Sequence, residues 1–224
     1  MGRVKAGMNF LRFRDKKELA NALAQKVAFL LNESLLNQKN ASIVVSGGKS
    51  PIEFFKSLSK TKINWERVLV TLADERMVDK YSKDSNERLV RDYLLKNEAK
   101  SAKFISLTLK TCSSLPSPFD VVVLGMGPDG HCASLFPCAK ELKEATDLRS
   151  KKSCIMITPL NAPYTRITLT LPRLLDARHI ILSINGRDKE KVFKKALEDG
   201  PNMEMPIRYF LRQKDIPLSI YYSP

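Results

Sequence analysis

The sequence predicts an α/β fold with three layers, in which helices cover both faces of a largely parallel central sheet. Apolar runs alternate with helical patterns along the whole chain, which is typical of such folds. Two of the runs, ASIVV and FDVVVLG, are almost entirely apolar, as strands buried on both faces are. No internal repeat and no low-complexity linker interrupts the pattern, so we expect a single domain over residues 8–224. We expect MGRVKAG, residues 1–7, to be leader or vector-derived sequence.

The first half of the chain predicts two strands and three helices. Apolar side chains recur at helical spacing over residues 16–37, which predicts a long helix. ASIVVSGG then predicts a buried strand that ends in glycines. Ser50 as N-cap and Pro51 as first helical residue predict the start of a helix over PIEFFKSLSK. RVLVTLADER predicts the next strand, and SNERLVRDYLLKN a helix capped by Ser85 or Asp84.

The second half continues the alternation. FDVVVLGMG and SCIMITPL predict strands, and TRITLTL alternates as a half-buried strand does. LPRLLDAR predicts a short helix, HIILSING a strand, and KEKVFKKALEDG a helix that Gly200 ends in the left-handed conformation. PLSIYY predicts a final strand. Ligands of such folds bind beyond the carboxyl ends of the strands, so the loops there are the places to look for chemistry.

The composition narrows the class of partner. The formal net charge is +14, but basic residues are spread over the chain and often stand beside acidic ones, as on solvated helix faces. The sequence contains no basic arm and no interleaved aromatic platform, so it favours a small anionic substrate over nucleic acid. It also has no signal peptide and no apolar stretch of about 20 residues, so we expect a soluble cytoplasmic protein without membrane contact. It does not indicate an oligomeric state.

The four cysteines show neither C-x-x-C pairing nor a histidine at zinc-ligand spacing. We therefore expect no metal site. We expect all four thiols to be reduced, as is usual in a cytosolic protein. The four cysteines are Cys112, Cys132, Cys138 and Cys154.

Two of the strand-end loops carry groups suited to an anion. The turn Gly47–Gly48–Lys49–Ser50 joins a strand to a helix, where backbone N–H groups can approach a ligand, although an ordinary tight turn reads the same way. It lacks the full G-x-x-x-x-G-K-S/T spacing of a nucleotide-binding P-loop.

Arg76 follows the next strand and could bind phosphate or carboxylate with its fork held by Asp74 and Glu75, or be a solvated charge. Arg166 and Lys189 stand at two later loops and would complete a basic pocket.

The loop GMGPDGH matches the glycine spacing of a dinucleotide-binding fingerprint, through Gly125, Gly127 and Gly130. Asp129 inside the turn would repel a pyrophosphate, and no acidic residue for the ribose follows at the expected distance. We expect His131 to project where the strand gives way to a helix, with Asp129 orienting it. Histidine titrates near neutral pH and is the usual general base, so this loop favours catalysis over cofactor binding.

Five segments occur in the order and approximate spacing of the 6-phosphogluconolactonases, and the chain resembles this family from Met8 almost to its end. They are SGGKSP, DERMV followed by SN, GMGPDGHCASLFP, APYTRITLTLP and NGRDK. The related glucosamine-6-phosphate deaminases share a G-x-G-x-D-G-H loop but continue differently beyond the histidine. DGH-x-ASLFP therefore places the resemblance with the lactonases. Cys132 departs from the usual threonine, and the C-terminal segment lacks the tryptophan and acidic residues often found there.

The resemblance implies a sugar-phosphate isomerase/deaminase-like fold, no metal and no cofactor. It implies hydrolysis of 6-phospho-D-glucono-1,5-lactone to 6-phospho-D-gluconate in the oxidative pentose phosphate pathway. His131 would be the base that activates water, and Asp129 would orient it. The residues implied to bind the phosphorylated sugar lactone are Gly47, Gly48, Lys49, Ser50, Arg76, Arg166 and Lys189.

Three other functions stay open at this point. A sugar-phosphate deaminase or isomerase of the glucosamine-6-phosphate type would release ammonia rather than open a lactone. A nucleic-acid-binding protein would explain the charge, and its binding would weaken steeply with salt. An NAD-dependent oxidoreductase would explain the glycine spacing and would bind its cofactor in a titration.

Overall fold

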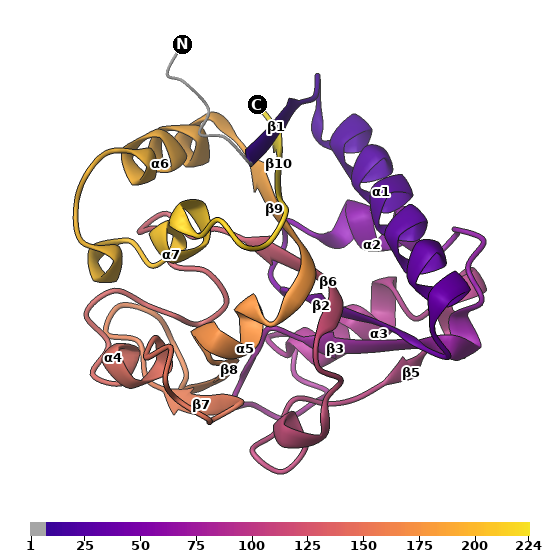
Figure 1. Ribbon diagram of the computed structural model, residues 1–224, viewed down its shortest axis with the longest axis horizontal. Helices are drawn as coiled ribbons and strands as arrows, with labels where there is room; N and C mark the ends of the chain where they lie inside the picture. The colour runs from indigo at the N-terminus through magenta and orange to yellow at the C-terminus, as the bar shows by residue number, and fades with distance from the viewer. Residues whose placement is uncertain (1–7) are drawn as a thin grey trace.

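A computed structural model describes residues 8–224, so the predicted leader at residues 1–7 lies outside the described residues. Seven strands form one sheet in which every neighbouring pair is parallel, which confirms the predicted fold class (Figure 1). In sheet order these strands are β1 (Met8–Arg12), β10 (Leu218–Ser223), β9 (Ala177–Asn185), β6 (Phe119–Gly125), β2 (Ala41–Val45), β3 (Val68–Leu72) and β5 (Lys103–Phe104).

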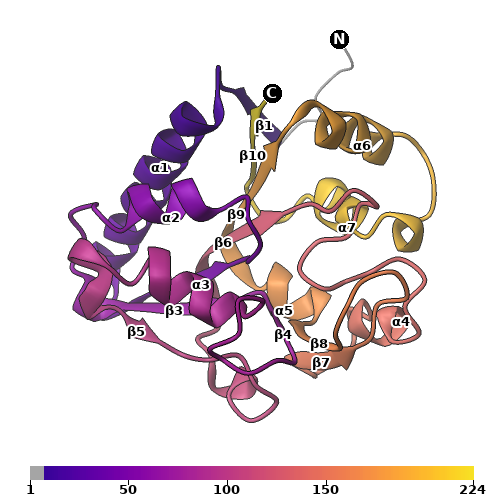
Figure 2. The same cartoon turned by 180° about the vertical axis from the view of Figure 1, so that it is seen from behind.

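Helices lie on both sides of this sheet, with α1 and α2 on one side and α6 and α7 on the other (Figures 1 and 2). The long predicted helix is confirmed as α1, and Asp15 caps it by accepting the N–H groups of Lys17 and Glu18. The helices are α1 (Lys16–Asn37), α2 (Ile52–Leu58), α3 (Asn86–Tyr93), α4 (Leu142–Ala145), α5 (Leu171–Leu175), α6 (Arg187–Leu197) and α7 (Ile207–Arg212).

The core lies at the centre of the sheet. All five residues of β2 are buried, as are the first six of β6, because both strands are covered on both faces. The apolar side of α1 packs on this surface, with Leu23, Val27 and Leu31 fully buried.

A second, antiparallel sheet of three strands stands beside the first. It corrects the prediction of one continuous strand over RVLVTLADER: the chain leaves the central sheet at Ala73, whose N–H bonds to Val45 of β2 and whose carbonyl accepts the N–H of Leu169 in β8. One residue thus joins the two sheets, and the charged DER segment becomes a strand of its own. The three strands are β4 (Asp74–Arg76), β8 (Arg166–Leu169) and β7 (Cys154–Ile157).

Three local predictions are wrong. β8 is buried along its whole length rather than on one face, because the hydroxyl of Thr168 is satisfied inside, donating to the Leu169 carbonyl and accepting from the N–H of Ser134. Ser50 does not cap α2, since Pro51 is the flanking residue and no side chain bonds the first turn. Helix α6 ends at Leu197 with extended backbone, so Gly200 is not its left-handed stop. Ser85 does cap α3, accepting the N–H of Arg88.

The prediction of reduced thiols is wrong for two of the four cysteines. Cys112, in the segment before β6, and Cys154, at the start of β7, form a disulfide across 42 residues of sequence. Cys132 and Cys138 are free. The pairing follows from the packing of the second sheet against the segment before β6, which sequence spacing does not reveal.

Candidate active site

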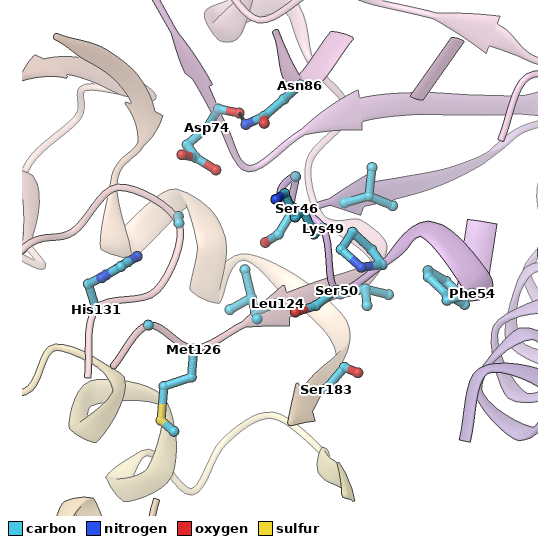
Figure 3. A pocket seen from close by; sticks show the side chains of 18 of the residues that line it. Ser46, Lys49, Ser50, Phe54, Asp74, Asn86, Leu124, Met126, His131 and Ser183 are labelled. Carbon is cyan, nitrogen blue, oxygen red and sulfur yellow. Dashed lines mark hydrogen bonds between the residues drawn. The ribbon is translucent and has the colours of Figure 1, made fainter. Parts of the chain in front are cut away.

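A pocket of about 280 Å³ lies at the carboxyl ends of the central strands. The parallel arrangement brings the loops after β2, β3, β6 and β9 to this one edge of the sheet, where such folds bind ligands. Eight of the nine predicted site residues line the pocket, among them His131, Lys49 and Ser50 (Figure 3). The ninth, Asp129, bonds to His131. The eight are Gly47, Gly48, Lys49, Ser50, Arg76, His131, Arg166 and Lys189.

His131 sits in a tight loop after β6, and not at the start of a helix as predicted. Residues 126–141 form turns before α4 begins at Leu142, because the N–H of Gly127 bonds back to the carbonyl of His131 at 2.9 Å. A dinucleotide fingerprint needs a helix N-terminus directly after its glycines to receive the pyrophosphate. In this segment Gly127 and Gly130 instead form the turn that holds the histidine, while Gly125 ends β6.

Asp129 fixes the proton on the His131 ring. Its carboxylate oxygen Oδ1 lies 2.5 Å from Nδ1 of His131 and also accepts the N–H of His131 at 3.1 Å. Partial burial acts to raise the pKa of Asp129, but the hydrogen bond and charge of His131 outweigh it, so this pKa lies below its ordinary value. An ionised carboxylate only accepts, so in the neutral imidazole Nδ1 carries the hydrogen and Nε2 has the free lone pair. Within residues 8–224, no side chain or backbone group bonds to Nε2.

The imidazole is also held from its face. The ring of Phe136 lies 4.2 Å from it, centroid to centroid, and the guanidinium of Arg166 lies 5.5 Å from the same phenyl ring. Phe136 is buried, so it fixes both groups from one side.

Gly127 gives the imidazole the room that it occupies. A Cβ added at Gly127 would lie 2.0 Å from Cε1 of His131, so Gly127→Ala must displace the ring. We expect this variant to lose most of its activity through kcat, at nearly unchanged thermal stability. Gly125→Ala is the matched comparison, because nothing lies within 4 Å of the added atom, and its effect should be much smaller. Equal losses in the two variants, measured as kcat and Tm, would contradict this account.

Cys132 stands next to His131 but is not suited to nucleophilic chemistry. Its side chain is buried, and burial together with the nearby Asp74 and Asp129 raises the pKa of its thiol well above the ordinary value. A thiol attacks as its thiolate, so this cysteine stays protonated and unreactive.

Arg76 and Arg166 reach the pocket from adjacent strands of the second sheet, at directly paired positions. Arg76 donates from Nη1 to the backbone carbonyl of Asp84 at 2.6 Å, and Arg166 donates from Nη2 to Pro163 at 3.2 Å. In both residues Nε is buried without a partner. Burial lowers the pKa of Arg166, opposed by Asp74, yet a guanidinium keeps its charge at any working pH.

The predicted role of the two acids beside Arg76 needs correction. Asp74 bonds to Ser134 and lies 3.9 Å from Arg166, while Glu75 turns away to α3. Glu75 accepts the N–H groups of Asn86 and Glu87 at 2.8 and 2.7 Å and so caps the start of that helix. Burial raises the pKa of Glu75 although these bonds oppose it. The Arg76 fork is therefore held by the Asp84 carbonyl.

The turn after β2 completes the pocket. Gly48 has a φ of 88°, which favours glycine, and a Cβ at Gly47 would lie 1.9 Å from the amide oxygen of Asn86. Lys189, in the first turn of α6, is half-buried and no acidic side chain of residues 8–224 pairs with it. Burial lowers the pKa of Lys189, and Lys16 lowers it further.

Sequence reasoning missed several residues around the pocket. Asp74 was treated only as support for Arg76, and Asn86 only as part of a family motif. One feature of the sequence could have indicated both: each is a polar residue at the end of a predicted strand or helix. The fold buries both residues, Asp74 to 5% exposure and Asn86 to 2%. Ser134 and Phe136, inside ASLFP, had no signal except their position after the histidine.

In residues 8–224, no three His, Cys, Asp or Glu side chains are grouped as metal ligands would be. Over the same range, none of the helices has the length and apolar character needed to cross a membrane.

Comparison with known proteins places the chain in a family. Residues 14–218 match the family model of glucosamine-6-phosphate isomerases/6-phosphogluconolactonase. A 6-phosphogluconolactonase of Mesorhizobium japonicum is 41% identical over an alignment of 232 positions, which covers 98% of this chain and 97% of that protein. The crystal structure of a 6-phosphogluconolactonase from Shewanella baltica superposes with a TM-score of 0.95 at 40% identity, over 100% of both chains.

A monomeric glucosamine-6-phosphate deaminase shares the fold, with a TM-score of 0.78 over 96% of this chain and 97% of that one. Its sequence identity is only 16%, so this likeness concerns the fold alone. The likeness to the lactonases extends to the sequence over almost the full length. The chain therefore belongs to the glucosamine-6-phosphate isomerase/6-phosphogluconolactonase family and, within it, to the 6-phosphogluconolactonases, which are lactone hydrolases.

Proposed function

We propose that this protein hydrolyses 6-phospho-D-glucono-1,5-lactone to 6-phospho-D-gluconate, the lactone-opening step of the oxidative pentose phosphate pathway, with His131 as general base. The observation that carries the proposal is the state of His131: Asp129 fixes the hydrogen on Nδ1, and Nε2 has its lone pair free beside a pocket lined by Arg76, Arg166 and Lys189. A base and several cations in one small pocket suit attack on an anionic, electrophilic substrate.

In the proposed reaction, Nε2 of His131 takes a proton from water while the water oxygen bonds to the lactone carbonyl carbon. The ionised Asp129 stabilises the imidazolium that forms. When the tetrahedral intermediate collapses, the bond from the carbonyl carbon to the ring oxygen breaks, and the imidazolium returns the proton to that oxygen. The carboxylic acid that results loses its own proton to solvent, so the enzyme ends in its starting state.

The basic residues have the remaining tasks. We assign the phosphate to Lys189, Arg166 and the turn after β2, since charged donors and backbone N–H groups there face one space. Arg76 lies on the neighbouring strand and is assigned to the substrate oxygens near the reacting carbon. A positioned base supplies a factor of about 10²–10⁴, and each oxyanion donor about 10²–10³ more.

The test is an assay with freshly prepared 6-phosphogluconolactone, following loss of the lactone above its spontaneous hydrolysis. We expect acceleration by the wild-type protein and no ammonia release from glucosamine 6-phosphate. Ammonia release without lactone hydrolysis would overturn the proposal in favour of a deaminase.

Lys189 predicts a pH dependence of product binding. Its pKa is lowered in the folded protein, so as the pH rises it loses its charge earlier than an ordinary lysine, and phosphate affinity should fall with it. We expect the Kd of 6-phosphogluconate, measured by calorimetry, to increase as the pH is raised from 7 to 10. Lys189→Arg stays charged over this range and should flatten the rise. The same rise in both proteins would exclude Lys189 as its cause.

A further inference from the structure

One carboxylate in the pocket has no task in the mechanism above. Asp74 is the first residue of β4, and its side chain lines the pocket that we assign to an anionic substrate. The residue is only 5% exposed, and Figure 3 shows its carboxylate directed into the pocket. A buried negative charge is costly and repels a phosphate, so its presence needs a reason.

The position of the Asp74 carboxylate is fixed by its neighbours. Its Oδ2 accepts the hydroxyl hydrogen of Ser134 at 2.5 Å, and Nη1 of Arg166 lies 3.9 Å from the same oxygen. Its backbone is held as well, because the carbonyl of Asp74 accepts from the amide of Asn86 at 2.9 Å and the residue pairs with Thr168 of β8. The side chain is thus pre-organised by contacts on one oxygen and on its main chain.

The second oxygen, Oδ1, is different. Within residues 8–224, no group donates a hydrogen bond to it, and it is not among the side-chain atoms that the fold seals off without a partner. Since the side chain is nearly buried and lines the pocket, Oδ1 has only the pocket to face. An ionised carboxylate oxygen accepts hydrogen bonds and offers none, so its partner must be a donor.

The charges around Asp74 decide what kind of donor that is. The negative charge of Asp74 would repel a phosphate or carboxylate group of the ligand. A cationic group of the ligand is not needed there, because the protein itself supplies two cations, Arg76 and Arg166. A neutral hydroxyl group satisfies the oxygen without adding charge, and hydrogen bonds to a charged acceptor are the strong ones.

We propose that Asp74 is a hydroxyl-binding residue, whose Oδ1 accepts a hydrogen bond from one ring hydroxyl of the lactone. This assignment rests on the proposed function and deepens it. It implies that the pocket binds a lactone ring that carries hydroxyl groups in preference to phosphorylated lactones that lack them. Ser134 is then a positioning residue, which aims the carboxylate by holding its other oxygen.

The test compares the parent lactone with three analogues that lack the hydroxyl at carbon 2, 3 or 4. We expect the wild type to lose a factor of about 10–10² in kcat/KM on one of them, as for a hydrogen bond to a charged group. Asp74→Asn, which can still accept from Ser134, should make this factor several times smaller than in the wild type, and Asp74→Ala should bring it close to one. Ser134→Ala should act through Asp74: it should lower kcat/KM on the parent lactone and bring this factor part of the way towards one, with little effect on the analogue that lacks the hydroxyl.

Asp92→Asn serves as the charge control, because it removes one carboxylate from the exposed surface of α3 and should leave the ratios unchanged. The proposal is overturned if all three analogues suffer the same loss in Asp74→Asn as in the wild type. Thermal unfolding identifies folded variants, and Asp74→Asn decides the matter if Asp74→Ala does not fold. Failure of the wild type to open the parent lactone would instead overturn the proposed function.

Discussion

Replacing His131 with asparagine should lower kcat by about 10²–10⁴-fold, the range that a positioned general base contributes. Asparagine keeps a polar side chain near Asp129 but has no basic nitrogen to take the proton from water. KM should change little, because the phosphate contacts that we assign lie on other residues. The measurement is steady-state kinetics on fresh lactone, corrected for spontaneous opening.

The chain offers a matched control in its only other histidine. His179 lies on β9 towards the start of that strand, paired with Val121 of β6, and does not line the pocket. Burial and nearby cations lower the pKa of His179. His179→Gln should retain wild-type kcat; an equal loss in both variants, or full activity in His131→Asn, would remove His131 from the chemistry.

The second large effect is expected for Arg166→Gln, in binding and in stability together. The side chain of Arg166 is 9% exposed, its guanidinium lies 3.9 Å from Asp74, and the residue lines the pocket where we place the phosphate. Losing a charge-assisted contact should raise KM about 10²-fold, with a smaller change in kcat. The carboxylate of Asp74 would also lose its cation inside the protein, which costs about 3 kcal/mol of unfolding free energy.

Urea unfolding and kinetics together test this expectation. Arg166→Lys should recover part of the stability, since it keeps the charge, but little of the affinity, since it lacks the planar fork. Arg149→Gln removes the same charge from a side chain that is 91% exposed and should change neither quantity. A wild-type KM in Arg166→Gln would exclude Arg166 from substrate binding.

The pattern of apolar residues was sufficient for the architecture of the central sheet. Residues 16–37 form one helix as predicted, and β2 and β6 are buried on both faces as their composition indicates. β1 was not predicted, because Met8–Arg12 has neither a continuous apolar run nor strict alternation and is a strand by pairing with β10. Non-local hydrogen bonds of this kind leave no local signature.

The second sheet shows the same limit at the site. The sequence contains the run from Val68 to Arg76 without a break, and only the contact of Ala73 with both sheets divides it. This division places Asp74 and Arg76 beside Arg166 and moves Glu75 to the start of α3. Likewise, the disulfide between Cys112 and Cys154 depends on the packing of two segments that are 42 residues apart.

By itself, the sequence determined the fold class, the edge of the sheet at which the pocket lies, and the pairing of Asp129 with His131. These follow from short-range pattern: apolar periodicity, glycines at strand ends, and two side chains two residues apart. Only the tertiary structure decided which charges meet. In the folded protein Asp74 bonds to Ser134 and lies beside Arg166, and Arg76 donates to the Asp84 carbonyl. One oxygen of Asp74 is left facing the pocket. A hydrogen bond acts over about 3 Å, so its partners are set by how the strands pair across the two sheets and not by distance along the chain.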